Sequence, residues 1–132
     1  MTAKVTYLGN LRTEAEHLQS GTKIITDAPV DNHGKGESFS PTDTVATALA
    51  TCMLTIMGIK AEALEIAIEG TTAQVTKTMA ANPRRISKIE VVFSFPKKYD
   101  DKVMKVLENA ARTCPVFYSL HPDMEKEIRF IW

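Results

Sequence analysis

Apolar and polar residues alternate along the first third of the chain in three short runs. The runs are Lys4 to Leu8, Arg12 to Leu18 and Thr22 to Thr26. Gly9-Asn10 separates the first two runs and Ser20-Gly21 the last two, and both dipeptides are typical of hairpin turns. The pattern therefore predicts a β-meander of three strands.

The residues from Thr44 to Ile59 form a long uncharged stretch, in which apolar residues recur with the period of a helix. Ser40 can cap this helix, Pro41 suits its first position, and Asp43 has the spacing of a capping box. Two apolar stripes leave no fully solvated face before Lys60; one is Val45, Leu49, Cys52, Ile56 and Ile59, and the other is Ala46, Ala50, Met53 and Met57. A domain of this size cannot easily enclose such a helix, so we expect a second copy of the chain to cover part of it.

The rest of the chain alternates between strand and helix patterns. We predict paired antiparallel strands over Glu65 to Thr78 and Ile86 to Phe95, and a last strand over Glu127 to Trp132. Between them, one helix is predicted from Asp100 to Arg112 and a short one from Cys114 to Leu120. The order of elements indicates an α+β layered domain.

Length and charge restrict the class of protein. The chain has 132 residues, which suits a single domain over residues 1–132. Sixteen basic and sixteen acidic side chains give no net charge, which argues against a nucleic-acid partner or an anionic membrane surface. The segment from Met1 to Gly9 lacks the apolar core of a signal peptide, and we expect a cytoplasmic protein. Thr44 to Ile59 is also short and polar for a membrane span.

The two cysteines are the main candidates for chemistry. In a reducing compartment such a pair is either two inert buried thiols or a reactive pair. The sequence contains no C-x-x-C and no H-E-x-x-H, and its three histidines, His17, His33 and His121, have no ligand spacing. We therefore predict neither a metal nor another cofactor.

Cys52 needs a cation from outside its helix if it is to be a thiolate near neutral pH. It lies about 18 Å from the helix start, at 1.5 Å per residue, where the helix dipole has little effect. Burial among apolar residues would raise its pKa rather than lower it. Arg12, on the second predicted strand, is the best candidate for the cation.

Three segments together resemble the OsmC/Ohr family of osmotically inducible and organic hydroperoxide resistance proteins. Ser40 to Cys52 resembles the signature of its central helix, Cys114-Pro115 its second cysteine motif, and Gly9 to Arg12 the segment with its active-site arginine. The resemblance implies an OsmC-like α+β fold, with a long buried central helix that carries Cys52. It also implies an intertwined homodimer with a site near the subunit interface.

The resemblance also implies the role of each candidate residue. Cys52 would attack the hydroperoxide, Cys114 would resolve the sulfenic acid as a disulfide, and Arg12 would stabilise the thiolate. A lipoyl or thioredoxin-like dithiol would then reduce the disulfide. Phe117 and Tyr118 could wall an apolar substrate pocket, although such aromatic residues are more often part of a core.

One position departs from the hydroperoxide-reducing branches of the family, in which an acidic residue follows the proline at the helix start. Here Thr42 follows Pro41 and the acid is Asp43, as in a less characterised branch. A shift of one residue rotates a helical side chain by roughly 100°. Asp43 could therefore cap the helix instead of orienting Arg12, and Glu37 could take its place beside the arginine.

The sequence thus favours a thiol-dependent peroxidase for small, mainly organic hydroperoxides in oxidative stress defence. Two alternatives remain open. One is a small-molecule or lipid binding protein that has the fold but little catalytic activity. The other is a thiol redox sensor that exchanges disulfides with a macromolecular partner.

Overall fold

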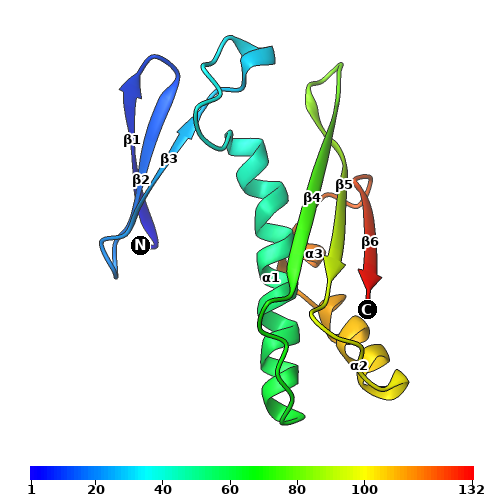
Figure 1. The fold of residues 1–132 in the computed structure, drawn as a ribbon. Helices are drawn as coiled ribbons and strands as arrows, with labels where there is room; N and C mark the ends of the chain where they lie inside the picture. The colour runs from blue at the N-terminus through cyan, green and yellow to red at the C-terminus, as the bar shows by residue number, and fades with distance from the viewer. The chain divides into compact units, whose positions relative to one another are not determined.

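The computed structural model describes residues 1–132, and the chain divides into two compact units, Met1–Val45 and Ala46–Trp132 (Figure 1). The predicted α+β class is confirmed, since two three-stranded sheets accompany three α-helices.

The first unit is built on the predicted β-meander. Its strands are β1 (Ala3–Gly9), β2 (Arg12–His17) and β3 (Lys23–Asp27), which pair antiparallel in the order β1-β2-β3. Asn10 and Leu11, the two residues between β1 and β2, both have positive φ angles, as such a tight turn requires, and Gly9 before them also has a positive φ. A short 3₁₀ turn, η1 (Val30–Asn32), follows in the loop after β3.

One face of this meander is apolar and exposed. Val5 and Tyr7 of β1 and Ile24 of β3 lie on the same face of the sheet, as the pairing of Val5 and Ile24 with Ala15 shows. Their exposed fractions range from 52% to 64%. The only buried residues of the first unit are Asp27 and Ser40, so the meander has no apolar core of its own.

Helix α1 (Pro41–Ala63) begins where the capping signals predict. The Ser40 hydroxyl accepts a hydrogen bond from the Asp43 backbone N–H at 3.0 Å, and an Asp43 carboxylate oxygen accepts one from the Ser40 N–H at 2.9 Å. These reciprocal bonds form a capping box and satisfy two backbone donors at the helix start. The first turn belongs to the first unit and the helix from Ala46 onward to the second.

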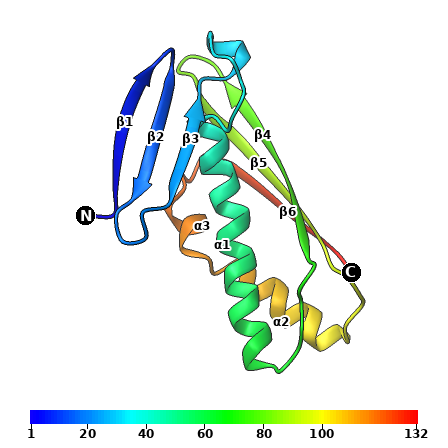
Figure 2. The same cartoon turned by 60° about the vertical axis from the view of Figure 1, so that its left-hand side comes forward.

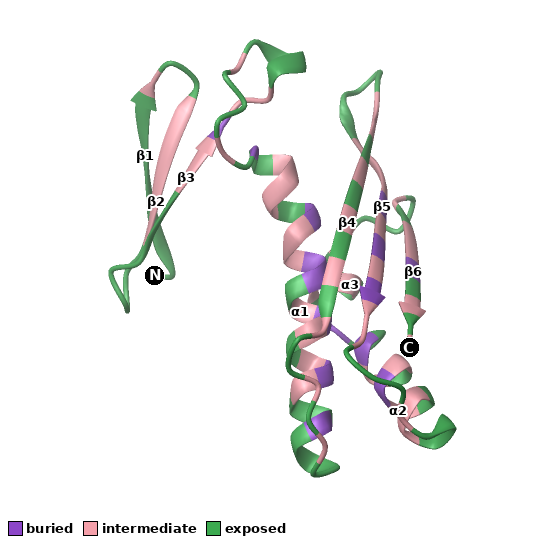
Figure 3. Ribbon diagram, viewed as in Figure 1, coloured by how far each residue is buried: buried purple, intermediate pink, exposed green.

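Only one of the two predicted apolar stripes of α1 is fully buried, and it is joined in the core by Leu49 of the other stripe and by Ala61. The buried stripe is shown in purple along one side of the helix in Figure 3 and consists of Ala46, Leu49, Ala50, Met53, Met57 and Ala61. On the other stripe, Val45 is 40% and Ile59 60% exposed. With 23 residues, α1 is long and apolar enough to span a membrane by length and composition, but core helices of soluble proteins also meet these criteria.

The buried stripe of α1 packs against a second sheet. This sheet has the order β4-β5-β6, formed by β4 (Thr72–Ala80), β5 (Arg85–Ser94) and β6 (Glu125–Ile131), and Figure 2 shows its strands side by side behind α1. Alternate residues of β5 enter the core, namely Ile89, Val91 and Phe93, each with no exposed surface. Burying each such side chain contributes about 1.5–3 kcal/mol to folding.

Two further helices complete the second unit. Helix α2 (Asp101–Ala111) is capped by the Asp100 carboxylate and adds Leu107 and Ala111 to the core. Helix α3 (Pro115–Ser119) follows after a tight turn. Because α2 and α3 connect β5 to β6, the last strand returns in the same direction and pairs parallel to β5.

Part of one predicted strand is wrong. Glu65–Thr71 is a turn-containing segment, and the strand begins at Thr72. Ile66 and Ile68 pack against the core from this connection, so their alternation with charged residues imitates a strand without sheet pairing.

Candidate active site

Cys114 is held at the start of α3, where it has no exposed surface. The following residue, Pro115, occupies the first helical position, and the Cys114 Sγ accepts a hydrogen bond from the Phe117 N–H at 3.2 Å. Burial raises the pKa of the Cys114 thiol, although this backbone hydrogen bond acts in the opposite direction. Cys114 is therefore a protonated thiol at neutral pH.

Cys52 lies in the middle of α1, half-buried, and its side chain contacts Cys114. A hydrogen bond and an electrostatic interaction with Cys52 add to the rise in the pKa of Cys114. Both cysteines are free thiols in the structure. The second unit therefore brings a partly accessible sulfur and a fully buried sulfur into contact, an arrangement in which one thiol can attack an oxidised form of the other.

Arg12 is the centre of an ion-pair network in the first unit. Its Nε and Nη2 bind the two carboxylate oxygens of Asp27 at 2.7 and 2.8 Å, and Nη2 also binds Glu37 Oε2 at 2.8 Å. Arg12 and Asp27 are directly opposite each other in the pairing of β2 and β3, which explains the bidentate geometry. Nη1 of Arg12 makes no hydrogen bond within the protein.

The network has a clear electrostatic effect on both partners. Hydrogen bonds to Asp27 and Glu37 raise the pKa of the Arg12 guanidinium. The hydrogen bond from Arg12 lowers the pKa of Asp27, whose side chain is only 3% exposed, against the opposing effect of burial. Arg12 is therefore a fixed positive charge in a defined orientation.

The structure gives the two candidate acids different contacts. Glu37, from the loop before α1, binds Arg12 directly. Asp43 takes part in the capping box with Ser40 at the start of α1. The carboxylate from the loop before α1 thus lies beside the arginine, while the acid at the helix start caps the helix.

Sequence reasoning missed Asp27, which is the more buried of the two acids that bind Arg12. The register of the strands could have revealed it. The predicted turn at Ser20-Gly21 pairs the second strand with the third, so that the residue at the end of the third strand lies opposite Arg12, and that residue is Asp27.

The two aromatic candidates lie on α3, after Cys114. The Phe117 ring packs against the core, with the Lys126 ammonium 5.5 Å from its centre. The Tyr118 side chain is 70% exposed, and its ring makes an edge contact with Phe117 at a centroid distance of 6.0 Å. Their role as walls of a substrate pocket remains a prediction.

Comparisons with known proteins identify the family. The family model of OsmC-like proteins matches residues 34–129. A solved structure from Psychrobacter arcticus 273-4, named for a response to osmotic stress and for detoxification, is 59% identical over 98% of this chain and 95% of its own, with a TM-score of 0.96. The chain therefore belongs to the OsmC-like family, as the sequence resemblance predicts.

More distant solved structures share the fold. One is the organic hydroperoxide resistance protein OsmC of Legionella pneumophila, which is 14% identical over 100% of this chain and 98% of its own, with a TM-score of 0.77. Another is a Vibrio cholerae protein named for organic hydroperoxide resistance, with captopril in one active site; it is 11% identical over 98% of this chain and 91% of its own, with a TM-score of 0.75. A comparison with curated proteins gives no match.

Proposed function

We propose that the chain is a thiol-dependent peroxidase that reduces organic hydroperoxides and serves in oxidative stress defence. The observation that carries this proposal is the contact between half-buried Cys52 and fully buried Cys114. Two peroxidase steps need such a pair, because the first sulfur must reach substrate and the second must reach the first. Membership of a family that includes organic hydroperoxide resistance proteins supports the same activity.

In the first step the Cys52 thiolate attacks the outer oxygen of the hydroperoxide. An S–O bond forms, the O–O bond breaks, and the alkoxide leaves and takes a proton to become an alcohol. Cys52 is oxidised to a sulfenic acid by two electrons, and the hydroperoxide is reduced by the same two. Arg12 would stabilise the thiolate and the leaving alkoxide, using the Nη1 group that has no partner within the protein.

In the second step Cys114 attacks the sulfur of the Cys52 sulfenic acid. A disulfide forms and water leaves, carrying the oxygen of the sulfenic acid. An external dithiol, of the lipoyl or thioredoxin type in the cytoplasm, then reduces the disulfide by two electrons. Because its pKa is raised, Cys114 stays protonated and unreactive toward peroxide before Cys52 is oxidised.

The test is hydroperoxide consumption with a dithiol reductant. Cys52→Ser should abolish turnover. Cys114→Ser should still consume about one equivalent of cumene hydroperoxide and then stop or become overoxidised. Unchanged turnover in both variants would exclude the mechanism.

The role of Arg12 needs its own variants. Arg12→Met should slow the reaction of Cys52 with peroxide, and Arg12→Lys should restore part of the rate, because the cation remains but the paired donors do not. Arg85→Met, at the first residue of β5, is a matched control because Arg85 donates to the carbonyl groups of Ala81 and Pro83 in the turn that precedes the strand. An equal rate for Arg12→Met and this control would contradict the role.

The proposal includes a homodimer. The apolar face of the meander and the uncovered side of α1 are the surfaces that a second copy would bury, at Val5, Tyr7, Ile24 and Thr55. Sedimentation equilibrium should give twice the mass of the chain. A monomer at micromolar concentration would contradict this part.

A further inference from the structure

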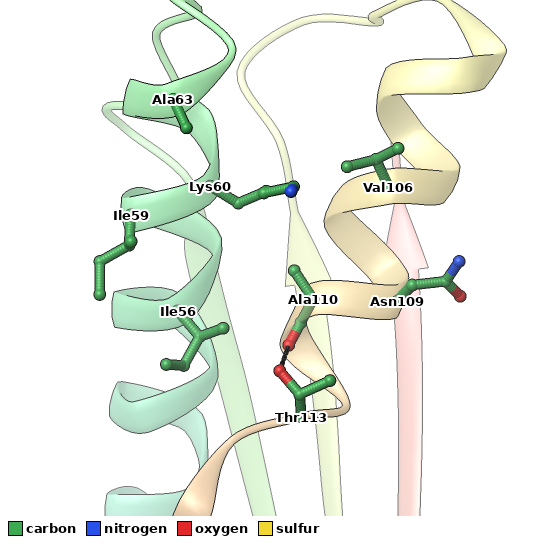
Figure 4. A pocket seen from close by; sticks show the side chains of 8 residues that line it. All are labelled: Ile56, Ile59, Lys60, Ala63, Val106, Asn109, Ala110 and Thr113. Atoms are coloured by element: carbon green, nitrogen blue, oxygen red, sulfur yellow. Dashed lines mark hydrogen bonds between the residues drawn. The ribbon is translucent and has the colours of Figure 1, made fainter.

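A groove of about 590 Å³ lies in the second unit, between α1 and α2, with Ile56, Ala110 and Thr113 together at one end (Figure 4). This end of the groove is next to the sulfur pair. Ile56 is one helical turn after Cys52 and therefore lies on the same side of α1. Thr113 directly precedes Cys114, and its hydroxyl donates a hydrogen bond to the Ala110 carbonyl at 2.7 Å.

The two sulfurs differ in how far a molecule from solvent can reach them. Cys52 is half-buried, on the side of α1 that faces the groove. Cys114 has no exposed surface, belongs to the apolar core, and does not line the groove although its neighbour Thr113 does. Of the pair, only Cys52 therefore offers surface to an external thiol.

The geometry of thiol–disulfide exchange makes this difference decisive. The attacking thiolate approaches one sulfur of the disulfide in line with the bond that breaks, so it must come from the side opposite the leaving sulfur. An attack on Cys52 comes from the side that is open, whereas an attack on Cys114 would have to come through the packed core.

We propose that the reductant enters by the groove and attacks Sγ of Cys52, and that Cys114 is the leaving group. The inference rests on the proposed peroxidase function and assigns the direction of its reductive step. A bond forms between the reductant sulfur and Cys52 Sγ, and the bond between Cys52 and Cys114 breaks. The electron pair of that bond goes to Cys114 Sγ, which then takes a proton.

The second thiol of the dithiol completes the step. It attacks the reductant sulfur of the mixed disulfide, a disulfide forms within the reductant, and Cys52 leaves as a thiolate. The dithiol loses two electrons and the protein disulfide gains them. Cys52 is thereby returned to the form that attacks the next hydroperoxide.

One electronic effect opposes this direction. Burial raises the pKa of the Cys114 thiol, and a thiol of higher pKa is a poorer leaving group. The Phe117 N–H, 3.2 Å from the Cys114 Sγ, offsets part of this effect because it stabilises negative charge on the departing sulfur. Access outweighs the remainder, because leaving-group pKa changes the rate by a graded amount whereas attack on Cys114 requires the core to open.

Trapping the mixed disulfide tests which sulfur is attacked. The protein is oxidised with diamide, mixed with glutathione, and quenched with N-ethylmaleimide well before reduction is complete. Peptide mapping should show glutathione on Cys52 and N-ethylmaleimide on Cys114, in at least about tenfold excess over the reverse pattern. An equal or larger share of glutathione on Cys114 would overturn the proposal.

A leucine variant tests the path through the groove. Ala110→Leu adds bulk at the end of the groove beside Cys52 and should slow the attack by glutathione roughly tenfold, because the thiol is displaced from its line of approach. Ala81→Leu is the matched control, since Ala81 is exposed in the turn before β5 and does not line the groove. Equal rates in the two variants would show that the groove is not the path.

The reach of each sulfur is also measurable without peroxidase activity. Cys114→Ser and Cys52→Ser each keep one thiol, which methyl methanethiosulfonate converts to a methyl disulfide and glutathione then releases. Release from Cys52 should be at least about tenfold faster than release from Cys114, and failure of the reagent to reach Cys114 supports the same conclusion. Equal release refutes the assigned direction even if the chain reduces hydroperoxides. Unequal release in a chain that reduces none retains the direction and removes only the proposed activity.

Discussion

Replacing Cys114 should lower the stability of the fold by an amount that depends on the new residue, whereas any replacement should prevent the disulfide with Cys52. The reason is that the sulfur both caps α3 and is the proposed disulfide partner. The Sγ has no exposed surface and accepts the hydrogen bond from Phe117 N–H at the start of α3. Cys114→Ala removes this acceptor and leaves the N–H without a partner, which costs about 1–2 kcal/mol for a helix cap. Loss of the buried sulfur adds roughly 1 kcal/mol from the space it leaves.

Serine should rescue the first of these losses. Ser is a good N-cap residue, so Cys114→Ser keeps an acceptor for Phe117 N–H and should lose only about 1 kcal/mol, against about 2–3 kcal/mol for Cys114→Ala. Urea unfolding with a reductant present measures the difference, and a thermal melt should show it as a gap of several degrees. Neither variant should form the disulfide with Cys52.

Equal stability of Cys114→Ala and Cys114→Ser would refute this reasoning. It would mean that the hydrogen bond to the sulfur contributes nothing to stability and that the position of Cys114 at the helix start has no structural role. Core variants provide a scale for the same assay, because Leu49→Ala, at a fully buried position, should cost about 2–5 kcal/mol.

Three further predictions concern the site and the core. Because Arg12 lowers the pKa of Asp27, the stabilisation from their pair is present above the unfolded pKa of about 3.9 and is lost as pH falls through the lower folded value. Unfolding measured from pH 5 to pH 2 should therefore show less acid sensitivity in Asp27→Asn, and equal profiles would contradict the pairing. Ser40→Ala should lose about 1 kcal/mol in urea unfolding, because the hydroxyl no longer accepts from Asp43 N–H; no loss would exclude the capping role. Phe93→Ala should cost about 3–5 kcal/mol in the same measurement, and a loss below 1 kcal/mol would contradict its burial.

Much of the fold follows from local signals. The turns at Gly9-Asn10 and Ser20-Gly21 separate the strands of the meander, and the capping signals at Ser40 and Pro41 start α1 where the structure has it. Short-range chemistry decides these boundaries, so a single sequence is enough. The strand prediction is wrong from Ile66 to Ile68. Isolated residues that a connection buries in the core alternate with exposed ones in the same way as the residues of a strand.

The site was predictable only in part, because its contacts depend on packing. The importance of Cys52 and Cys114 came from family resemblance, and no periodicity shows that their side chains meet. The hydrogen bonds between Asp27 and Arg12 depend on the register of β2 and β3. Such contacts join residues far apart in sequence, where local patterns carry little information.

The most direct test of the account is the product of one equivalent of cumene hydroperoxide on the fully reduced protein. We predict one cumyl alcohol per chain and a protein mass lower by two hydrogens. Peptide mapping should show a single Cys52–Cys114 disulfide. Recovery of both free thiols with the peroxide unconsumed, or oxidation of Cys52 to higher acids with Cys114 still free, would contradict the central claim that the two sulfurs act as a pair.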